Sequence, residues 1–166
     1  MRLWHKDLIP VLPTKQLIAQ WRELCAIAGS IDKNGTPNHL LVNKVLNYPP
    51  LHYIIYTDAI CEEMKKRGYV VSRSAYTTLS ARLGRNLDVF DMQTYLYVPK
   101  GVSEVYRDWH NERYLIQCYS NLQEKFDCGG IPKYEWDAIE DFMERRYAND
   151  DQRSRSNPRI KSAHHS

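Results

Sequence analysis

The feature that most constrains the fold is a run of apolar residues at helical spacing close to the N-terminus. Leu17, Trp21, Leu24 and Ala28 recur every three or four residues, so they would share one face of a helix over Lys15–Ala28. Similar spacing recurs in several later segments, whereas the alternation typical of strands is minimal. The sequence therefore predicts an all-α fold.

Chain breakers and capping residues set the expected limits of these helices. Pro10 and Pro13 interrupt the chain before the first helix, for which Thr14 is the predicted N-cap and Gly29 the predicted stop. The other predicted helices span residues 38–46, 51–67, 72 or 74 to 83, 111–127, and a segment that begins at Pro132. In the second of these, the predicted core side comprises Leu51, Ile54, Ile55 and Met64. The stretch from Asp88 to Gly101 is interpreted as a loop that carries Tyr95 and Tyr97 as aromatic anchors.

The apolar pattern ends near residue 148 and divides the chain into two parts. With 166 residues, the chain is long enough for one compact domain, which we place at residues 1–148 as five to six helices. From Asn149 the composition turns to Arg, Ser, Asp, Asn and His without an apolar period, which predicts a disordered, mildly basic tail over residues 149–166.

Charge and cysteine content narrow the class of protein. A net charge of +3 is compatible with a nucleic-acid partner but falls short of the strongly basic surface of a dedicated binder. The four cysteines, at positions 25, 61, 118 and 128, match no common zinc spacing, so we expect free thiols in a reducing cytosol. There is no secretory signal pattern, and no apolar run is long enough to span a membrane. A cytoplasmic protein is expected.

The second face of the first helix carries an unusual carboxylate. This face comprises Gln16, Ala19, Gln20, Glu23 and Ala26, and Glu23 has no lysine or arginine one helical turn away. Helix physics alone favours a partly solvated face packed against a loop. The usual catalytic signatures are absent, and the histidines show no metal-ligand spacing.

Three short segments nevertheless resemble the pyrimidine-dimer DNA glycosylase family, the endonuclease V-type enzymes of phage and bacteria. The first is Met1-Arg2-Leu3 followed by Trp21-Arg22-Glu23-Leu24, similar to the family's free N-terminus, adjacent arginine and aromatic-Arg-Glu-Leu motif. The second is His39 with the Lys66-Arg67-Gly68-Tyr69 ending of the next helix. The third is His110 to Glu112, leading to Leu122-Gln123-Glu124-Lys125. The order and spacing of the segments agree with those of the family from Met1 to about Phe126.

The resemblance implies a DNA-repair glycosylase that also cleaves the strand by β-elimination, an activity called AP lyase. In this family the N-terminal α-amine attacks C1′ of the damaged nucleotide and forms a Schiff base, while a glutamate of the first helix transfers protons. The matching groups are the amine of Met1 and the carboxylate of Glu23, with Arg22 beside it. An ordinary α-amine has a pKa of about 7.7–8.0, so a useful fraction is unprotonated at neutral pH. Because Arg2 is a large residue, we expect Met1 to be retained.

The same resemblance implies the partner and the residues that contact it. The expected substrate is double-stranded DNA with a lesion or an abasic site, contacted by Arg2, His39 and Lys125. Neither a metal nor an organic cofactor is implied, and a monomer is expected. Two positions depart from the family pattern, since Ala26 and Asn121 stand where the family has arginines. The DNA contacts are therefore expected to be fewer or differently placed.

Two other readings of the sequence remain open. A non-catalytic helical DNA-binding protein could keep the family fold without the reaction, which the two missing arginines would favour. An enzyme of another class could use His39 or His110, although nothing in the sequence selects a partner for either histidine.

Overall fold

The computed structural model describes residues 1–92 and 98–156, with side chains up to residue 152. Its elements, in chain order, are η1 (Lys6–Val11), α1 (Thr14–Asn34), η2 (Asn43–Asn47), α2 (Pro50–Lys66), α3 (Arg73–Arg85), η3 (Leu87–Val89), η5 (Val102–Glu104), α4 (Glu112–Asp127) and α5 (Lys133–Ser156). No strand occurs among the described residues, so the predicted all-α class is confirmed. Tyr95 and Tyr97, the expected aromatic anchors, lie outside the described residues.

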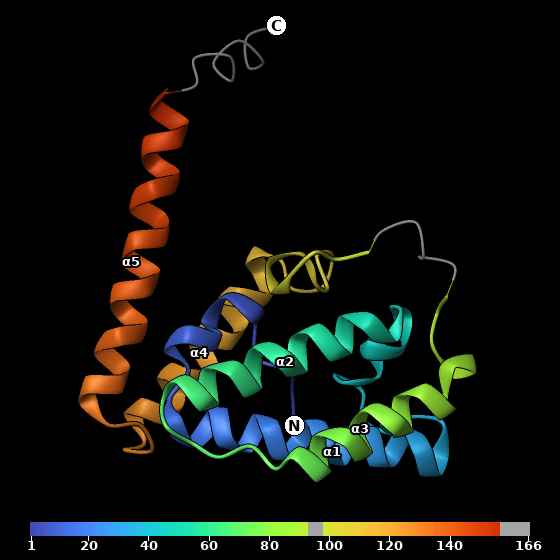
Figure 1. Ribbon diagram of the computed structural model, residues 1–166. Coiled ribbons are helices and arrows are strands. Elements are labelled where there is room, and N and C mark those ends of the chain that lie inside the picture. The colour runs from blue at the N-terminus through green and yellow to red at the C-terminus, as the bar shows by residue number, and fades with distance from the viewer. Residues whose placement is uncertain (93–97, 157–166) are drawn as a thin grey trace, which may run out of the picture.

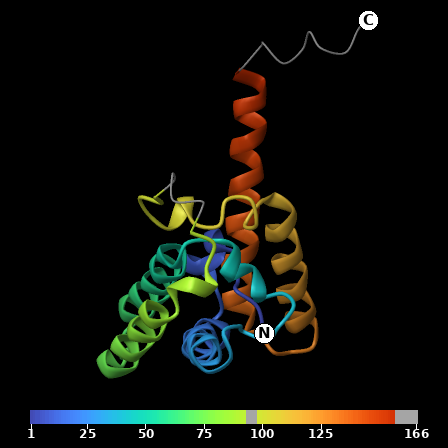
Figure 2. The same ribbon diagram turned by 90° about the vertical axis from the view of Figure 1, so that its right-hand side faces the viewer.

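The helices are arranged around α1, which packs against both α2 and α3. Figure 1 shows α2 over α1 with α3 alongside, and Figure 2 shows α4 on the side of α1 opposite to α3. The short helix η1 contacts α2 and α5, and α5 extends well beyond the other helices in both views. Within the described part of the chain, no helix has the length and apolar character needed to cross a bilayer.

The first helix is longer than predicted, because Gly29 does not end it. The helix continues to Asn34, and the stop is Gly35, whose φ of 70° is left-handed and whose N–H donates to Ile31 O. A Cβ at Gly29 would lie 3.0 Å from the Nη1 atom of Arg82, the end of a flexible side chain. The predicted stop was wrong because the helix continues through Gly29, and the left-handed residue that ends it is Gly35.

The buried face of α2 differs in part from the predicted one, since Met64 is buried as predicted but the other predicted residues are not fully buried. Leu51 is exposed and both isoleucines are only half-buried, whereas Tyr53 and Tyr56 are completely buried. The two tyrosine hydroxyls donate to main-chain oxygens, of Leu24 at 2.6 Å and of Trp4 at 2.7 Å. These hydrogen bonds offset the cost of removing the hydroxyls from water, which lets tyrosine replace an aliphatic residue in the core.

The predicted helix over residues 38–46 is replaced by a turn followed by η2. The side-chain oxygen of Asn43 accepts hydrogen bonds from the His39 N–H at 3.1 Å and from the Thr36 hydroxyl at 3.3 Å. Asn38 has a φ of 54°, outside the helical region. Short polar side chains that bond the local backbone compete with an α-helix, and here they prevail.

The remaining predicted helices are close to those observed. Ser72 caps α3 by accepting from the Ala75 N–H, and Asn111 caps α4 by accepting from the Tyr114 N–H.

The expected boundary at residue 148 needs correction, because α5 continues to Ser156. Residues 149–156 contain neither proline nor glycine, so nothing in them interrupts the helix. Residues 157–166 lie outside the described part.

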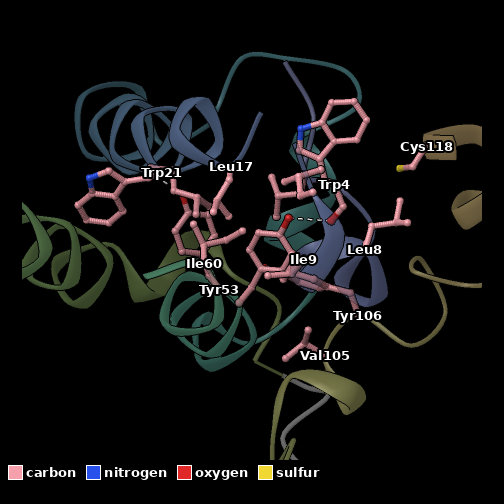
Figure 3. Packing of buried hydrophobic residues seen from close by; sticks show 14 of the residues in the cluster. Trp4, Leu8, Ile9, Leu17, Trp21, Tyr53, Ile60, Val105, Tyr106 and Cys118 are labelled. Atoms are coloured by element: carbon pink, nitrogen blue, oxygen red, sulfur yellow. Dashed lines mark hydrogen bonds between the residues drawn. The ribbon is translucent and has the colours of Figure 1, made fainter. Parts of the chain in front are cut away.

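The core is built around the N-terminal segment rather than beside it. Leu3, Trp4, Leu8 and Ile9 are all buried. Figure 3 shows Trp4, Leu8 and Ile9 among residues of α1, α2 and the chain before α4, including Leu17, Tyr53, Ile60, Val105 and Tyr106. Residues close to the N-terminus are therefore fixed by the main hydrophobic core of the protein. The four cysteines are free thiols in this structure.

Candidate active site

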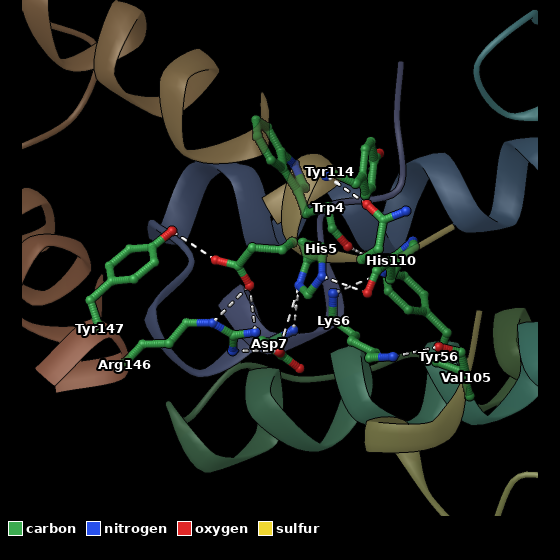
Figure 4. A network of polar contacts seen from close by, with 12 residues as sticks. Trp4, His5, Lys6, Asp7, Tyr56, Val105, His110, Tyr114, Arg146 and Tyr147 are labelled. Carbon is green, nitrogen blue, oxygen red and sulfur yellow. Dashed lines mark hydrogen bonds and ion pairs between the residues drawn. The ribbon is translucent and has the colours of Figure 1, made fainter. Parts of the chain in front are cut away.

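Side chains from three helices hold the main chain of residues 2–4. Gln20 Nε2 of α1 donates to Arg2 O at 3.1 Å, Tyr114 Oη of α4 donates to Leu3 O at 2.5 Å, and Tyr56 Oη of α2 donates to Trp4 O at 2.7 Å. We call Gln20, Tyr56 and Tyr114 the carbonyl clamp. Figure 4 shows both tyrosines of the clamp at this segment. Three consecutive carbonyls are thus each bound by a different helix.

The clamp also fixes the direction of the segment along α1. The Trp4 N–H donates to Gln20 Oε1 at 2.8 Å, so one glutamine side chain bonds the main chain on both sides of Leu3. Tyr56 Oη lies 3.0 Å from the same Gln20 oxygen. Leu3 and Trp4 are buried, whereas the side chain of Met1 is 51% exposed. The chain therefore emerges from the core at Met1.

Glu23 lies on the α1 face that carries the clamp. It follows Gln20 by three residues, a spacing that puts two side chains on the same side of a helix. It is partly exposed, and among the described residues it forms no hydrogen bond or ion pair. Burial raises the pKa of Tyr56 well above its ordinary value, and the charge on Glu23 adds to this shift. The carboxylate thus lies within electrostatic reach of the tyrosine that bonds Trp4.

The side chain of Arg2 extends from the N-terminal segment toward α4. Its guanidinium carbon is 5.3 Å from the centre of the Trp4 ring. Burial raises the pKa of the Cys118 thiol, and the nearby charge of Arg2 opposes that shift. Lys125 is exposed and follows Cys118 by seven residues, so the two lie on one side of α4. Tyr114 precedes Cys118 by four residues and bonds Leu3, so this side of α4 faces the segment at Tyr114.

The other two predicted site residues are less closely tied to this arrangement. Arg22 is exposed on α1, adjacent to Glu23 in sequence but on a different side of the helix. His39 lies in the turn before η2 instead of opening a helix, and its Nδ1 is buried without a partner among the described residues. The structure therefore shows the clamp on residues 2–4, with Glu23 on the same side of α1 as Gln20. Met1 and Glu23 remain the predicted reacting groups, and Arg22, His39 and Lys125 remain predicted site residues.

Two surface pockets lie elsewhere, one of about 310 Å³ lined by Asp58, Cys61 and Tyr76, and one of about 500 Å³ that includes Val102 and Phe142. Neither is lined by Met1 or Glu23.

Buried histidines join the clamped segment to the chain before α4, as Figure 4 shows. His5 Nε2 donates to His110 O at 2.8 Å, and His110 Nδ1 accepts from the Lys6 N–H at 3.0 Å. His5 Nδ1 accepts from the Asp7 N–H at 3.1 Å. Because a main-chain N–H can only donate, each Nδ1 must be unprotonated. Both rings are therefore neutral imidazoles.

A third histidine has the same arrangement on α2. His52 Nδ1 accepts from the Tyr106 N–H at 3.0 Å. Burial lowers the pKa of His5, His52 and His110, and the positive charge of Lys6 adds to the shift at each ring, whereas Asp7 opposes it at His5. The pKa of His110 falls well below its ordinary value. These rings stay neutral in the folded protein under conditions in which an unfolded chain would protonate them.

We therefore expect the protein to lose stability as the pH falls through 6.5 and below. In this window the unfolded chain binds more protons than the folded one, so the free energy of unfolding decreases with decreasing pH. Each such histidine contributes a slope of up to about 1.4 kcal/mol per pH unit. His110→Asn, which keeps an acceptor for the Lys6 N–H, should make the slope shallower. Urea unfolding between pH 7 and pH 5 measures it, and parallel curves for the two proteins would contradict this account.

The fold and site together define an all-α protein whose N-terminal segment is clamped against its first helix. Residues 1–77 of the chain match the family described as pyrimidine dimer DNA glycosylase. The resemblance stated from sequence motifs is thereby confirmed for this part, which contains Met1, Arg2, Arg22, Glu23 and His39. Neither curated proteins nor solved structures give a match to the chain.

The sequence did not reveal the residues that organise the site. Gln20 appeared only as a polar member of the second face of α1, with no indication that it bonds the main chain of Arg2 and Trp4. Tyr114 lies more than a hundred residues from Leu3 in sequence, and a single tyrosine in an amphipathic helix carries no signal for such a bond. The one available signal was that Gln16, Gln20 and Glu23 form a polar row without charged partners.

Proposed function

We propose that this protein is a DNA-repair glycosylase of the pyrimidine-dimer type with AP lyase activity. The observation that carries the proposal is the bonding of Gln20 to both sides of Leu3, which holds the end of the chain against the α1 face of Glu23. The family match over residues 1–77 supports DNA as the substrate. Amine catalysis needs a free α-amine close to a carboxylate, and the clamp on residues 2–4 together with Glu23 on the same side of α1 supports the proposal.

The proposed reaction uses the α-amine of Met1 as nucleophile. The amine attacks C1′ of the damaged nucleotide, the base leaves, and the sugar ring opens as a Schiff base forms between C1′ and the amine nitrogen. Glu23 transfers protons in these steps and its negative charge stabilises the cationic imine. Loss of a proton from C2′ then expels the phosphate at C3′ and breaks the strand. Hydrolysis of the imine frees the amine.

The duplex has to deform for this chemistry to occur. C1′ of a stacked nucleotide is inaccessible to a protein surface, so the duplex must bend or a nucleotide must leave the stack. Arg2, Arg22 and Lys125 are proposed to hold the phosphates of the deformed strand, with His39 as a further contact. All four are at least partly exposed, as such contacts require.

The proposal is tested with three duplexes that carry an abasic site, a cyclobutane pyrimidine dimer or no damage. Untagged protein should cut both the abasic duplex and the dimer duplex, while the undamaged control stays intact. Cleavage of the abasic duplex alone would reject the dimer glycosylase and leave the AP lyase. The N-terminal residue of the purified protein is first verified by mass spectrometry. Binding to all three duplexes without any cleavage would instead identify a helical DNA-binding protein, and the proposed enzyme would be rejected.

Lys125 offers a separate test of how the protein binds DNA. Lys125→Ala should weaken binding to damaged and undamaged duplex alike and reduce the slope of log affinity against log salt concentration by about 0.9, because one phosphate contact is lost. Lys133→Ala is the matched control, since the charge of Lys133 is already paired with Asp137. Fluorescence anisotropy at several salt concentrations measures both slopes. Equal slopes for wild type and Lys125→Ala would remove this residue from the interface.

A further inference from the structure

The carbonyl clamp does more than bury polar groups, because it sets where the end of the chain points. Burial of the Leu3 and Trp4 side chains alone would leave the main chain free to rotate about them. The bonds to the carbonyls of Arg2, Leu3 and Trp4 remove that freedom, since each carbonyl is directed at a different helix. The main chain of residues 2–4, from which Met1 extends, is therefore held by α1, α2 and α4 together.

The contact from α4 is the shortest and comes from the part of the chain beyond the family match. Tyr114 Oη lies 2.5 Å from Leu3 O, and its ring packs against His110 at a centroid distance of 5.1 Å and against Trp109 at 5.8 Å. Burial raises the pKa of Tyr114, so the hydroxyl keeps its proton and remains a donor. Residues 1–77 thus supply both reacting groups but only two of the three helices that place them.

We infer that Tyr114, Tyr56 and Gln20 are positioning residues that aim the α-amine of Met1 at its target beside Glu23. The inference rests on the proposed function. It assigns to α4 a role in the rate of amine attack that is separate from DNA binding. A group misplaced by about 1 Å loses on the order of 10²-fold in rate, so even a small displacement of residues 2–4 should be measurable.

The chain offers matched controls for both tyrosines. Tyr53 is as completely buried as Tyr56 and lies on the same helix, but its hydroxyl donates to Leu24 O of α1 instead of to the N-terminal segment. Tyr119 lies on α4 with Tyr114, and its ring stacks on Trp136. Tyr53→Phe removes a buried hydrogen bond of the same kind without touching residues 2–4, so it separates positioning from a general loss of stability.

The experiment measures the single-turnover rate of borohydride-trapped adduct formation with a saturating abasic duplex, together with DNA affinity. Tyr114→Phe and Tyr56→Phe should reduce the rate about tenfold or more, with affinity changed less than about twofold. Tyr53→Phe and Tyr119→Phe should retain the wild-type rate. Gln20→Glu keeps the acceptor for the Trp4 N–H but loses the donor to Arg2 O, and should resemble Tyr114→Phe. Equal rates in all five variants would overturn the positioning role while leaving the proposed function intact.

If the wild-type protein forms no adduct, the proposed function is rejected. A second measurement then tests whether the clamp orders residues 2–4. Amide hydrogen exchange at Trp4 reports directly on the clamp, because this N–H donates to Gln20. Exchange should be faster in Tyr114→Phe and Tyr56→Phe than in Tyr53→Phe at equal global stability. Identical exchange in the three variants would show that the clamp does not order the segment.

Discussion

Replacing Glu23 by glutamine is expected to reduce adduct formation and strand cleavage by about 10²- to 10⁴-fold. Glutamine has the same shape but can neither accept a proton nor offset the positive charge of the imine. Glu23 forms no hydrogen bond or ion pair among the described residues, so its carboxylate has no structural bond to lose. The stability of the variant should therefore remain within about 0.5 kcal/mol of wild type, as is usual for such surface positions.

The control for this variant is Glu144→Gln on α5. Glu144 is exposed and makes no bond to the N-terminal segment, so its replacement should leave cleavage unchanged. Gel assays with an abasic duplex and thermal unfolding, carried out on both proteins, separate a loss of chemistry from a loss of folding. A Glu23→Gln protein that cuts abasic DNA at the wild-type rate would show that another group transfers the protons.

Extending the chain before Met1 is expected to have the second large effect. One added residue moves the free amine by up to about 3.5 Å, because the clamp holds residues 2–4 and prevents the segment from sliding back. A displacement of that size should lower the rate of adduct formation by at least about 10²-fold. Removal of the extension with a protease that regenerates Met1 should restore the activity.

The same extension at the C-terminus serves as the control and should have no effect. DNA affinity of the N-terminally extended protein should stay within a few fold of wild type, because Arg22 and Lys125 are unaffected. Full activity with an N-terminal extension would exclude the α-amine as nucleophile. A side-chain amine such as that of a lysine would then be the group to identify by the same trapping reaction.

The sequence predicted the class and most helices but not how the helices meet. Apolar periodicity located α1, α2 and α4 because amphipathic helices leave a pattern within one turn. The end of α1 was misplaced because the local pattern does not tell Gly29 from Gly35, and only Gly35 adopts the left-handed conformation that ends the helix. Likewise the buried face of α2 was misjudged because Tyr53 and Tyr56 look amphipathic until their main-chain acceptors are known.

For the candidate site, the sequence pointed to the proposed reacting groups but not to the residues that hold the N-terminal segment, because contacts between distant residues leave no local pattern. Glu23 and Met1 could be proposed from a family resemblance, which the match over residues 1–77 supports. The groups that place them could not, because a hydrogen bond from Tyr114 to Leu3 joins distant parts of the chain. The turn at His39 differed from the predicted helix because the Asn43 side chain bonds the local backbone.

Covalent capture followed by mass spectrometry tests the central claim most directly. Borohydride reduces an imine to a stable bond, so protein incubated with an abasic duplex and borohydride should yield one crosslinked species. After digestion, the sugar fragment should be found on the α-nitrogen of Met1, and the crosslink should be nearly absent from Glu23→Gln protein. A crosslink on a lysine side chain, or no crosslink with either abasic or ultraviolet-damaged DNA, would contradict the account.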